Sequence, residues 1–216
     1  MGADIETTEL RSQIWGKCNL KINSRPWSQG DSVPQSGLLL LRHAHRQSDP
    51  DPQIDADFTI SERGIKESQN LGSAWEGAAP SHVLSSPEPR CQETSNALVD
   101  SAGWKLKVRT LKVLSGYPFI CDWEKMKGHL SKHGFKILKE YVNGEKVYPG
   151  MRPRDVGVKD VLSELNQWLN DDLVICVTHD FTIANISGFI GYKPIIWSDF
   201  LSGLYLKLNN VGGLDL

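Results

Sequence analysis

Short, wholly apolar runs alternate with longer amphipathic stretches along this chain. The runs 38–41 (LLLL) and 173–178 (LVICVT) are apolar on both faces, as expected of central strands in a parallel sheet. Apolar residues at helical spacing in 61–75 and 158–169 predict amphipathic helices. Alternating strands and helices predict an α/β fold, a three-layer α/β/α sandwich with a mixed, mainly parallel sheet.

Further elements complete this expected domain. A short strand that ends at Ser85 should lead through a turn at Pro87 into a helix that closes near Gly103. Residues 180–190 form another apolar helical stretch, and 202–208 is expected to be a final strand, as an antiparallel edge of the sheet.

Composition shifts suggest how the domain is organised. Residues 1–36 have weak periodicity and end in a stretch rich in Ser, Pro and Gly, which predicts an irregular N-terminal extension. Residues 37–216 are expected to be a single domain. Within it, residues 111–157 are punctuated by Gly and Pro and are expected to be an insertion that acts as a lid over a site.

Charge and hydropathy exclude several classes of partner. The net charge of -2 and the pI near 6.3 give no overall attraction to nucleic acid or to an anionic membrane. No apolar run reaches the roughly 18 residues that a membrane helix needs, and the polar start does not resemble a signal peptide. We therefore expect a cytoplasmic protein without nucleic-acid or membrane partners, whose oligomeric state the sequence does not reveal.

The cysteines give no sign of a zinc site or a disulfide framework. The chain has 4 cysteines and no CxxC pair. They are widely spaced, at Cys18, Cys91, Cys121 and Cys176. Cys176 falls in an apolar run, where a reduced and buried thiol is expected.

Functional side chains follow the expected strands at their carboxyl ends. Arg42 and His43 follow the first run, Arg90 lies one turn beyond Ser85, and His179 and Asp180 follow the run 173–178. In open α/β sheets ligands bind beyond the carboxyl ends of the strands. If these strands are neighbours, the side chains form one anion-binding pocket.

The residue types in that pocket suit phosphoryl transfer. Arginine forks two N–H groups onto phosphate oxygens and is permanently charged. A neutral imidazole can attack phosphorus and so divide hydrolysis into two transfers. An alkoxide leaving group needs a proton donor, and Asp180 is the best-placed carboxyl group.

Several motifs resemble the histidine phosphatase superfamily, whose members share the phosphoglycerate mutase-like fold. LLLLRHAHR resembles its R-H-G signature, LSSPEPRCQET its S-S-P-x-x-R-x-x-x-T segment, and VTHDFTI the H-D motif of its acid phosphatase branch. FTISERGIKESQNLG and DFLSGLYLKL resemble a helix and the closing strand of the family. The matches follow the family's order from Gly37 to Leu208, which makes the combination specific.

The resemblance implies a fold, an activity and a site. It implies a metal-independent phosphomonoester hydrolase without cofactors, which acts through a phosphohistidine and releases inorganic phosphate; the expected lid favours a small phosphorylated metabolite as the substrate. It implies that His43 is the nucleophile and Asp180 the general acid. It also implies a phosphate-binding set, which is Arg42, Arg46, Arg90 and His179.

Three points leave the site partly open. Ala44 replaces the usual Gly of the signature, which is tolerated only if its φ is negative. The mutase branch takes its acid from a region comparable to 111–157, so Asp122, Glu124 and Glu145 are alternatives to Asp180. Arg46 has an alternative role as an ion-pair partner of the acidic stretch that follows it.

Other functions share part of this pattern. A phosphomutase of the phosphoglycerate mutase type would use the same first half-reaction. A non-catalytic module that binds phosphorylated ligands is a further alternative. A metal site built from His43, His45, His179 and Asp180 is disfavoured, because Arg42 and Arg46 flank the first two histidines and would repel a dication. His129 and His133 are spaced like helical metal ligands but lack an evident third one.

Overall fold

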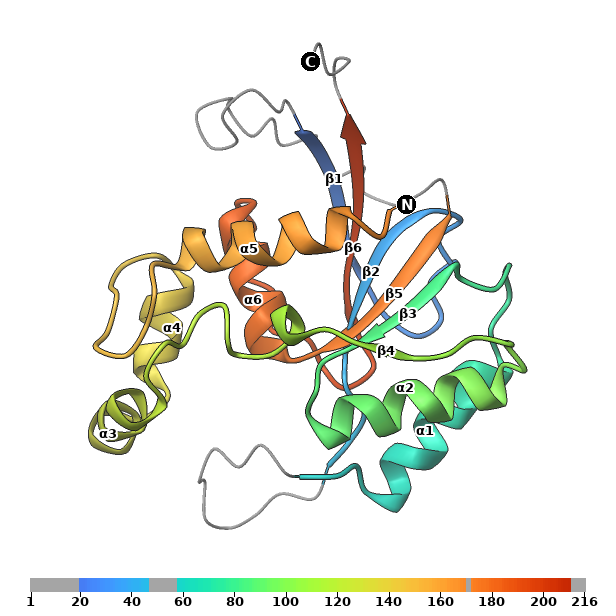
Figure 1. The fold of residues 1–216 in the computed structure, drawn as a ribbon, viewed down its shortest axis with the longest axis horizontal. Coiled ribbons are helices and arrows are strands. Elements are labelled where there is room, and N and C mark those ends of the chain that lie inside the picture. Colours follow the sequence, from blue (N-terminus) through green and yellow to red (C-terminus); the bar gives the residue numbers. More distant parts are fainter. Residues whose placement is uncertain (1–19, 47–57, 170–171, 211–216) are drawn as a thin grey trace.

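The computed structural model describes residues 20–46, 58–169 and 172–210, which build a six-stranded mixed sheet with helices on both faces (Figure 1). The strands are β1 (Leu20–Trp27), β2 (Gly37–Arg42), β3 (His82–Ser85), β4 (Arg109–Thr110), β5 (Leu173–Thr178) and β6 (Gly203–Asn210). Their order is β1-β6-β2-β5-β3-β4. The strands β2, β5, β3 and β4 are parallel, and β6 is antiparallel to both of its neighbours.

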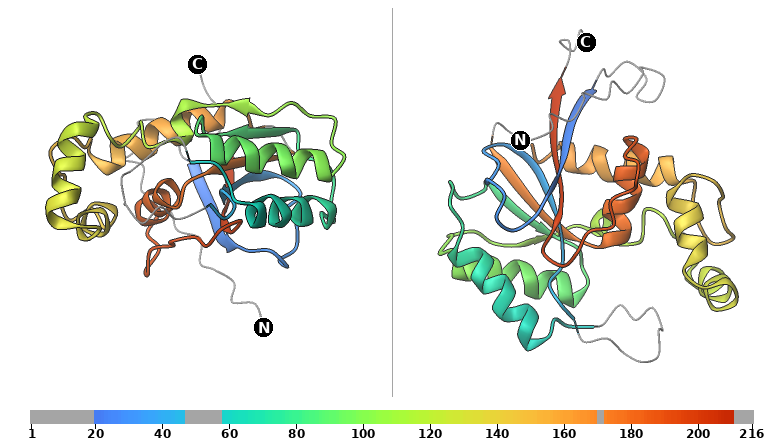
Figure 2. Two further views of the ribbon diagram at one scale, coloured as in Figure 1. Left: turned by 90° about the horizontal axis from the view of Figure 1, so that it is seen from below. Right: turned by 180° about the vertical axis from the view of Figure 1, so that it is seen from behind.

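Two layers of helices cover the sheet. The helices are α1 (Glu62–Ser73), α2 (Pro89–Ser101), α3 (Trp123–His133), α4 (Lys136–Val142), α5 (Arg154–Asn166) and α6 (Asp180–Phe189), with a 3-10 turn η1 at Lys112–Leu114. Figure 2 shows α1 and α2 together on one side of the sheet and α5 and α6 on the other. The predicted three-layer α/β/α sandwich is confirmed.

The leucines of β2 show why the sheet needs cover on both faces. Leu38 and Leu40 pack into the core beneath α5 and α6, whereas Leu39 and Leu41 pack into the core beneath α1 and α2. All four are fully buried, because successive side chains of a strand point to opposite faces. A run without polar residues therefore stabilises two cores at once, and it fixes β2 in the middle of the sheet.

The N-terminal extension is not irregular throughout, contrary to expectation. Leu20–Trp27 forms β1, which pairs with β6 along its whole length. Consequently β6 is antiparallel as predicted, but it is an inner strand and β1 is the edge. The close approach of β6 to β2 requires Gly203, because a Cβ at this position would lie 1.7 Å from the carbonyl oxygen of Leu40.

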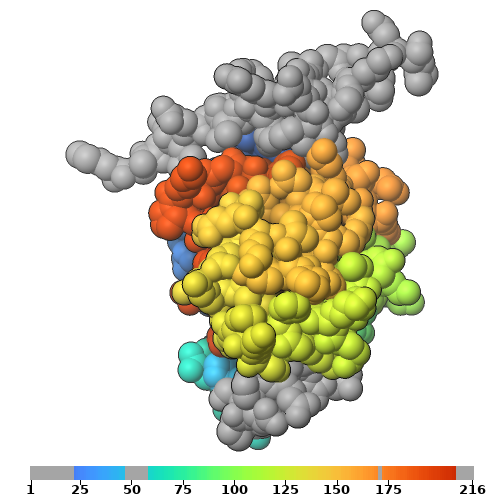
Figure 3. Space-filling view, turned by 90° about the vertical axis from the view of Figure 1, so that its left-hand side faces the viewer, coloured from blue at the N-terminus to red at the C-terminus, as the bar shows by residue number. Residues whose placement is uncertain are grey.

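The segment 111–157 is more helical than its Gly and Pro content suggests. It contains η1, α3 and α4, and its end forms the start of α5. Figure 3 shows α3, α4 and α5 gathered on one face of the molecule. No helix within the described residues is long and apolar enough to cross a membrane.

Candidate active site

The topology brings the carboxyl ends of three parallel strands together. Since β5 lies between β2 and β3, the residues that follow these strands are neighbours. The backbone N–H of His43 donates to the carbonyl of Thr178 at 3.0 Å, and that of Ser86 donates to Val177 at 2.9 Å. The structure therefore places the side chains that follow β2, β3 and β5 in one cluster, as the sequence led us to expect.

His43 is a buried, neutral imidazole with one tautomer fixed. Its Nδ1 lies 2.8 Å from the carbonyl oxygen of Ala44. A carbonyl only accepts hydrogen bonds, so Nδ1 carries the hydrogen and Nε2 keeps its lone pair. Burial, then the nearby His179 and the arginines, lower the pKa of His43 to about 2. The ring is thus prepared to act as a nucleophile through Nε2.

Arg42 is held from three sides. Its guanidinium donates to the carbonyl of Ser198 at 2.8 Å and lies 3.1 Å from a carboxylate oxygen of Asp180. The ring of Phe200 packs on it, with 4.2 Å from the guanidinium carbon to the ring centroid. The same ring lies 5.7 Å from the ring of His43, so Phe200 contacts both residues of the expected signature.

His179 lies between a carboxylate and a guanidinium. Its Nε2 is 3.1 Å from Glu88 Oε2 and 3.1 Å from Ser86 Oγ, and its Nδ1 is 3.2 Å from a terminal nitrogen of Arg90. The rings of His179 and His43 meet edge to face at 5.5 Å. Two helix starts converge here, because Arg90 lies in the first turn of α2 and His179 is the N-cap of α6.

Thr94 ties the two halves of the cluster together. Its Oγ1 accepts a hydrogen bond from the backbone N–H of Ala44 at 3.0 Å and donates one to the carbonyl of Arg90 at 2.7 Å. Ala44 is not strained, since Leu201 is the one non-glycine residue with positive φ in the described part of the chain. Ala44 does not have a positive φ, so its methyl group is tolerated at the position where the family signature has Gly.

Arg46 lies at the margin of the cluster. Its guanidinium packs over the ring of Phe58 at 5.1 Å. The pKa of Arg90 is lowered mainly by burial, and the positive charge of Arg46 is close enough to lower it further. The acidic stretch that is its alternative partner, residues 48–57, lies outside the described residues. His45 turns away from His43, because its Nδ1 contacts Ser61 Oγ at 2.8 Å.

The carboxyl groups of 111–157 have contacts of their own. The Glu124 side chain is 87% exposed and pairs with Lys127, and Asp122 caps α3 by accepting from the N–H of Lys125. Glu145 accepts from Asn143. In this geometry Asp180 is the candidate acid that directly contacts the cluster, through Arg42.

The described residues contain no cluster of potential metal ligands. No group of three or more His, Cys, Asp or Glu side chains there could hold a metal ion. His129 and His133 stack on each other at 6.0 Å. The described cysteines, Cys91, Cys121 and Cys176, are free thiols.

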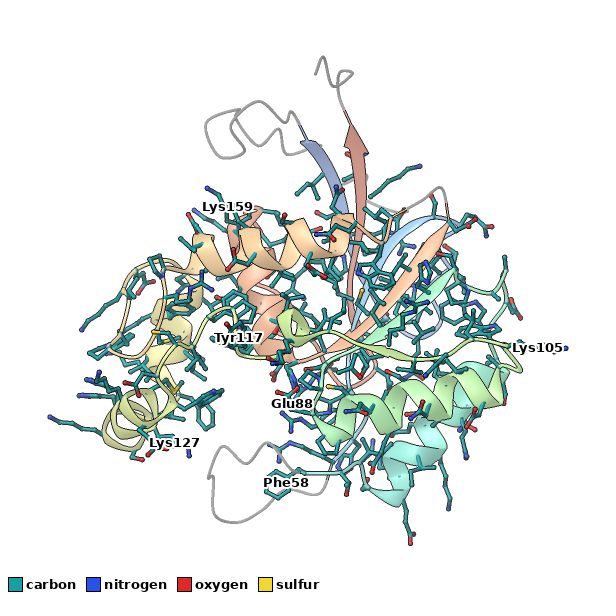
Figure 4. All side chains as sticks on the ribbon, in the orientation of Figure 1. Phe58, Glu88, Lys105, Tyr117, Lys127 and Lys159 are labelled. Carbon is teal, nitrogen blue, oxygen red and sulfur yellow. The ribbon has the colours of Figure 1, made fainter. Side chains whose placement is uncertain are left out.

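Sequence reasoning missed two residues of the cluster. Glu88 stands inside the quoted SSPEPR motif, and its spacing from Ser86 and Arg90 was the available signal. Phe200 reaches the site from the loop between α6 and β6; it stands at the start of the segment DFLSGLYLKL, but that resemblance gave it no role. Figure 4 shows Glu88 between the labelled side chains of Tyr117 and Phe58, with Lys127 farther to the side.

Together these residues bring cationic side chains, an imidazole lone pair and a carboxyl group into one cluster. Arg42 and Arg90 supply permanent positive charge, His43 supplies a lone pair, and Asp180 supplies a carboxyl group beside Arg42. Such a set can bind a phosphoryl group, attack it and stabilise the charge that develops on its oxygens.

Comparison with known proteins gives a family match that spans the residues of the cluster. The family model described as "Histidine phosphatase superfamily (branch 1)" matches residues 38–200. The similarity of the H-D motif to the acid phosphatase branch is not confirmed by this match. A comparison with curated proteins found no match.

Solved structures share the fold at low sequence identity. A phosphoglycerate mutase from Bacillus anthracis has a TM-score of 0.58 and 15% identity, covering 82% of this chain and 94% of its own. A mycobacterial glucosyl-3-phosphoglycerate phosphatase in complex with VO3 has a TM-score of 0.57 and 16% identity, covering 81% and 97%. An alpha-ribazole phosphatase from Shigella flexneri has a TM-score of 0.50 and 21% identity, covering 71% and 79%.

Proposed function

This chain belongs to the histidine phosphatase superfamily, and we propose that it hydrolyses phosphomonoesters through a covalent phosphohistidine at His43. The observation that carries the proposal is the fixed tautomer of His43. Because Nδ1 donates to the Ala44 carbonyl, Nε2 keeps its lone pair, and Arg42, Arg90 and His179 are close enough to His43 to help lower its pKa. The low pKa of His43, which burial and the adjacent His179 cause, keeps that lone pair unprotonated at neutral pH.

The first transfer follows from these contacts. Nε2 of His43 attacks phosphorus, the P–O bond to the leaving group breaks, and the phosphoryl group moves to the imidazole. Arg42, Arg90 and, from the margin, Arg46 offset the negative charge of the equatorial oxygens. Water then attacks the phosphohistidine, passes a proton to the Asp180 carboxylate left by the first transfer, and releases inorganic phosphate as the P–N bond breaks, which restores the neutral ring.

Asp180 is the proposed general acid. It lies 3.1 Å from Arg42, so a phosphoryl group that engages Arg42 competes with Asp180 for the same guanidinium. A dianionic ligand beside a carboxyl group also favours the protonated form of that group. Substrate binding would thus free Asp180 and favour the proton that it passes to the leaving oxygen.

We propose a small phosphorylated metabolite as the substrate. Support comes from the segment that follows Leu114, whose carbonyl oxygen accepts a hydrogen bond from Thr178 next to His179; three residues on, this segment carries Tyr117 with 64% exposed surface. Exposed aromatic rings at a site can stack on a ring-bearing leaving group. The three solved structures above are named a phosphoglycerate mutase, a glucosyl-3-phosphoglycerate phosphatase and an alpha-ribazole phosphatase, and these names refer to small molecules.

The experiment is hydrolysis of an aryl phosphate by wild type and His43→Ala, with and without a chelator. Turnover that resists the chelator and is lost in a folded His43→Ala variant supports the proposal. Turnover by His43→Ala contradicts it. Transfer of the phosphoryl group to an added alcohol or phosphoglycerate, without release of phosphate, would favour a mutase.

A further inference from the structure

We propose that Glu88 is a positioning residue that lets His179 take up a second proton when a phosphoryl group binds, so that an imidazolium holds the group. The inference rests on the proposed function, since it concerns the phosphate site of that reaction. It starts from an unusual neighbour for an anion site, a carboxylate bound directly to a histidine of the cluster.

The placement of Glu88 is specific. It is the N-cap residue of α2, but its side chain makes no capping hydrogen bond. Instead its Oε2 accepts from Ser86 Oγ and contacts Nε2 of His179 at 3.1 Å. Burial alone would raise the pKa of Glu88, but the hydrogen bonds from His179 and Ser86 outweigh burial and lower it to about 2. Glu88 is therefore a carboxylate at neutral pH.

This contact fixes the tautomer of His179. A carboxylate only accepts and a guanidinium only donates, so Nε2 carries the hydrogen and Nδ1 accepts from Arg90. In that neutral form Nδ1 has no hydrogen to donate to a phosphoryl oxygen. His179 can therefore bind phosphate through Nδ1 only after that nitrogen is protonated.

The proposed step balances as a simple proton uptake. A dianion binds, Arg90 turns its N–H group from Nδ1 to a phosphoryl oxygen, and one proton from solvent adds to the lone pair on Nδ1. The imidazolium then lies between two anions, with Glu88 at Nε2 and the phosphoryl oxygen at Nδ1. No other bond forms or breaks.

Each charged group around His179 acts on this step. Burial and Arg90 lower the pKa of His179, whereas Glu88 and Asp180 raise it. The two remaining neighbours stay neutral, since burial lowers the pKa of His43 and raises the pKa of the Cys91 thiol far above neutrality. Of the two carboxylates, Glu88 is the one that contacts the ring directly.

The test is calorimetric binding of inorganic phosphate between pH 5 and 8.5 to wild type, Glu88→Gln and a control, Glu76→Gln, which removes an exposed carboxylate after α1. We expect Glu88→Gln to weaken phosphate binding about tenfold at pH 7 and to move the alkaline decline of affinity about one pH unit lower, since one pKa unit is a factor of ten. The titration of phosphate itself is common to all the proteins and cancels. Wild type in buffers of different ionisation enthalpy should take up more protons per phosphate than Glu88→Gln.

Two further measurements distinguish a positioning role of Glu88 from a purely structural one. In a His179→Asn background, Glu88→Gln should leave the pH dependence unchanged, because its effect passes through His179. In wild type labelled with ¹⁵N-histidine, phosphate should move both His179 nitrogens to protonated-type shifts, a result that does not depend on any variant folding.

Opposite results would overturn the inference. They are phosphate binding by Glu88→Gln that is as tight as, or tighter than, that of wild type with the same pH profile, or an Nδ1 that stays unprotonated at saturating phosphate. If wild type hydrolyses phosphomonoesters but Glu88→Gln binds phosphate with unchanged affinity and pH profile, this inference is wrong and the proposed function stands. Wild type that neither binds phosphate nor hydrolyses aryl phosphate would overturn the proposed function as well.

Discussion

A carboxylate oxygen of Asp180 lies 3.1 Å from the guanidinium of Arg42, so the proposed acid and the expected phosphoryl group share one partner. The pairing joins the first turn of α6 to the end of β2. In the proposed reaction, this pairing would connect substrate binding to the release of Asp180, the proposed proton donor.

Asp180→Asn should affect substrates according to their leaving groups. An alkoxide needs a proton far more than an aryl oxide does, so kcat on an alkyl phosphate should fall about 10²-fold or more, and on an aryl phosphate by less than about tenfold. Steady-state rates on the two substrates check this. Asp100→Asn, at the exposed end of α2, is the control. Equal losses on both substrates would move the acid elsewhere, with Glu124 the next candidate.

Phe200→Leu should weaken the hold on Arg42. Leucine keeps apolar contact but lacks the ring face that lies 4.2 Å from the guanidinium. A cation–π contact of this kind contributes about 0.5–2 kcal/mol, so kcat/KM should fall about 2- to 30-fold. Phe200→Tyr should keep most of the wild-type value. The matched control is Phe135→Leu, whose ring is 62% exposed at the start of α4. Wild-type kinetics for Phe200→Leu would show that the ring contributes nothing to the site.

Thr94→Val should destabilise the protein. Valine has a similar shape but cannot accept from the N–H of Ala44, which would then be buried without its partner. We expect a loss of about 1–3 kcal/mol in the free energy of unfolding, measured by urea denaturation. Thr110→Val, at an exposed position of β4, provides the comparison. A loss no larger than that of Thr110→Val would mean that the hydrogen bond from Ala44 to Thr94 does not stabilise the folded protein.

Stability should fall as the pH drops below about 6.5. The folded-state pKa of His43 is lowered from 6.5 to about 2, chiefly by burial, so below pH 6.5 the unfolded chain binds the extra proton and the folded one does not. Each pH unit below 6.5 then removes about 1.4 kcal/mol per such histidine. His43→Gln should show a shallower decline of unfolding free energy from pH 6.5 to 5.

The control for that titration is His133→Gln, which replaces an exposed histidine of α3. The lowered pKa of Glu88 acts in the same direction but only below about pH 4.5, so measurements above pH 5 isolate the histidines. An identical decline in wild type and His43→Gln would contradict a buried neutral His43.

Hydrophobic patterning predicted the centre of the fold because burial on two faces leaves no room for polar residues. The leucines of β2 and the run in β5 were recognisable for this reason. Leu20–Trp27 was not, because an edge strand is partly solvated and its alternation is interrupted by Ser24 and Pro26. Its pairing with β6 is a tertiary property that no local pattern records.

The residues of the cluster could be predicted where the end of a strand fixes their position. Arg42, His43, Arg90 and His179 follow from the strands and from the order of the motifs. Glu88 and Phe200 were missed because their importance depends on which way a side chain turns from a helix start or a long loop. Only the contacts of Glu88 with His179 and of Phe200 with Arg42 in the folded protein reveal their orientation.

The central claim is that His43 carries the phosphoryl group. The direct measurement is rapid denaturation during turnover of a ³²P-labelled phosphomonoester, followed by peptide mapping of the label. We predict a label that is lost in acid, is stable in alkali and maps to His43, and that is absent from a folded His43→Gln variant. Label on another residue, or multiple turnovers by wild type under conditions in which His43 is never labelled, would contradict the account.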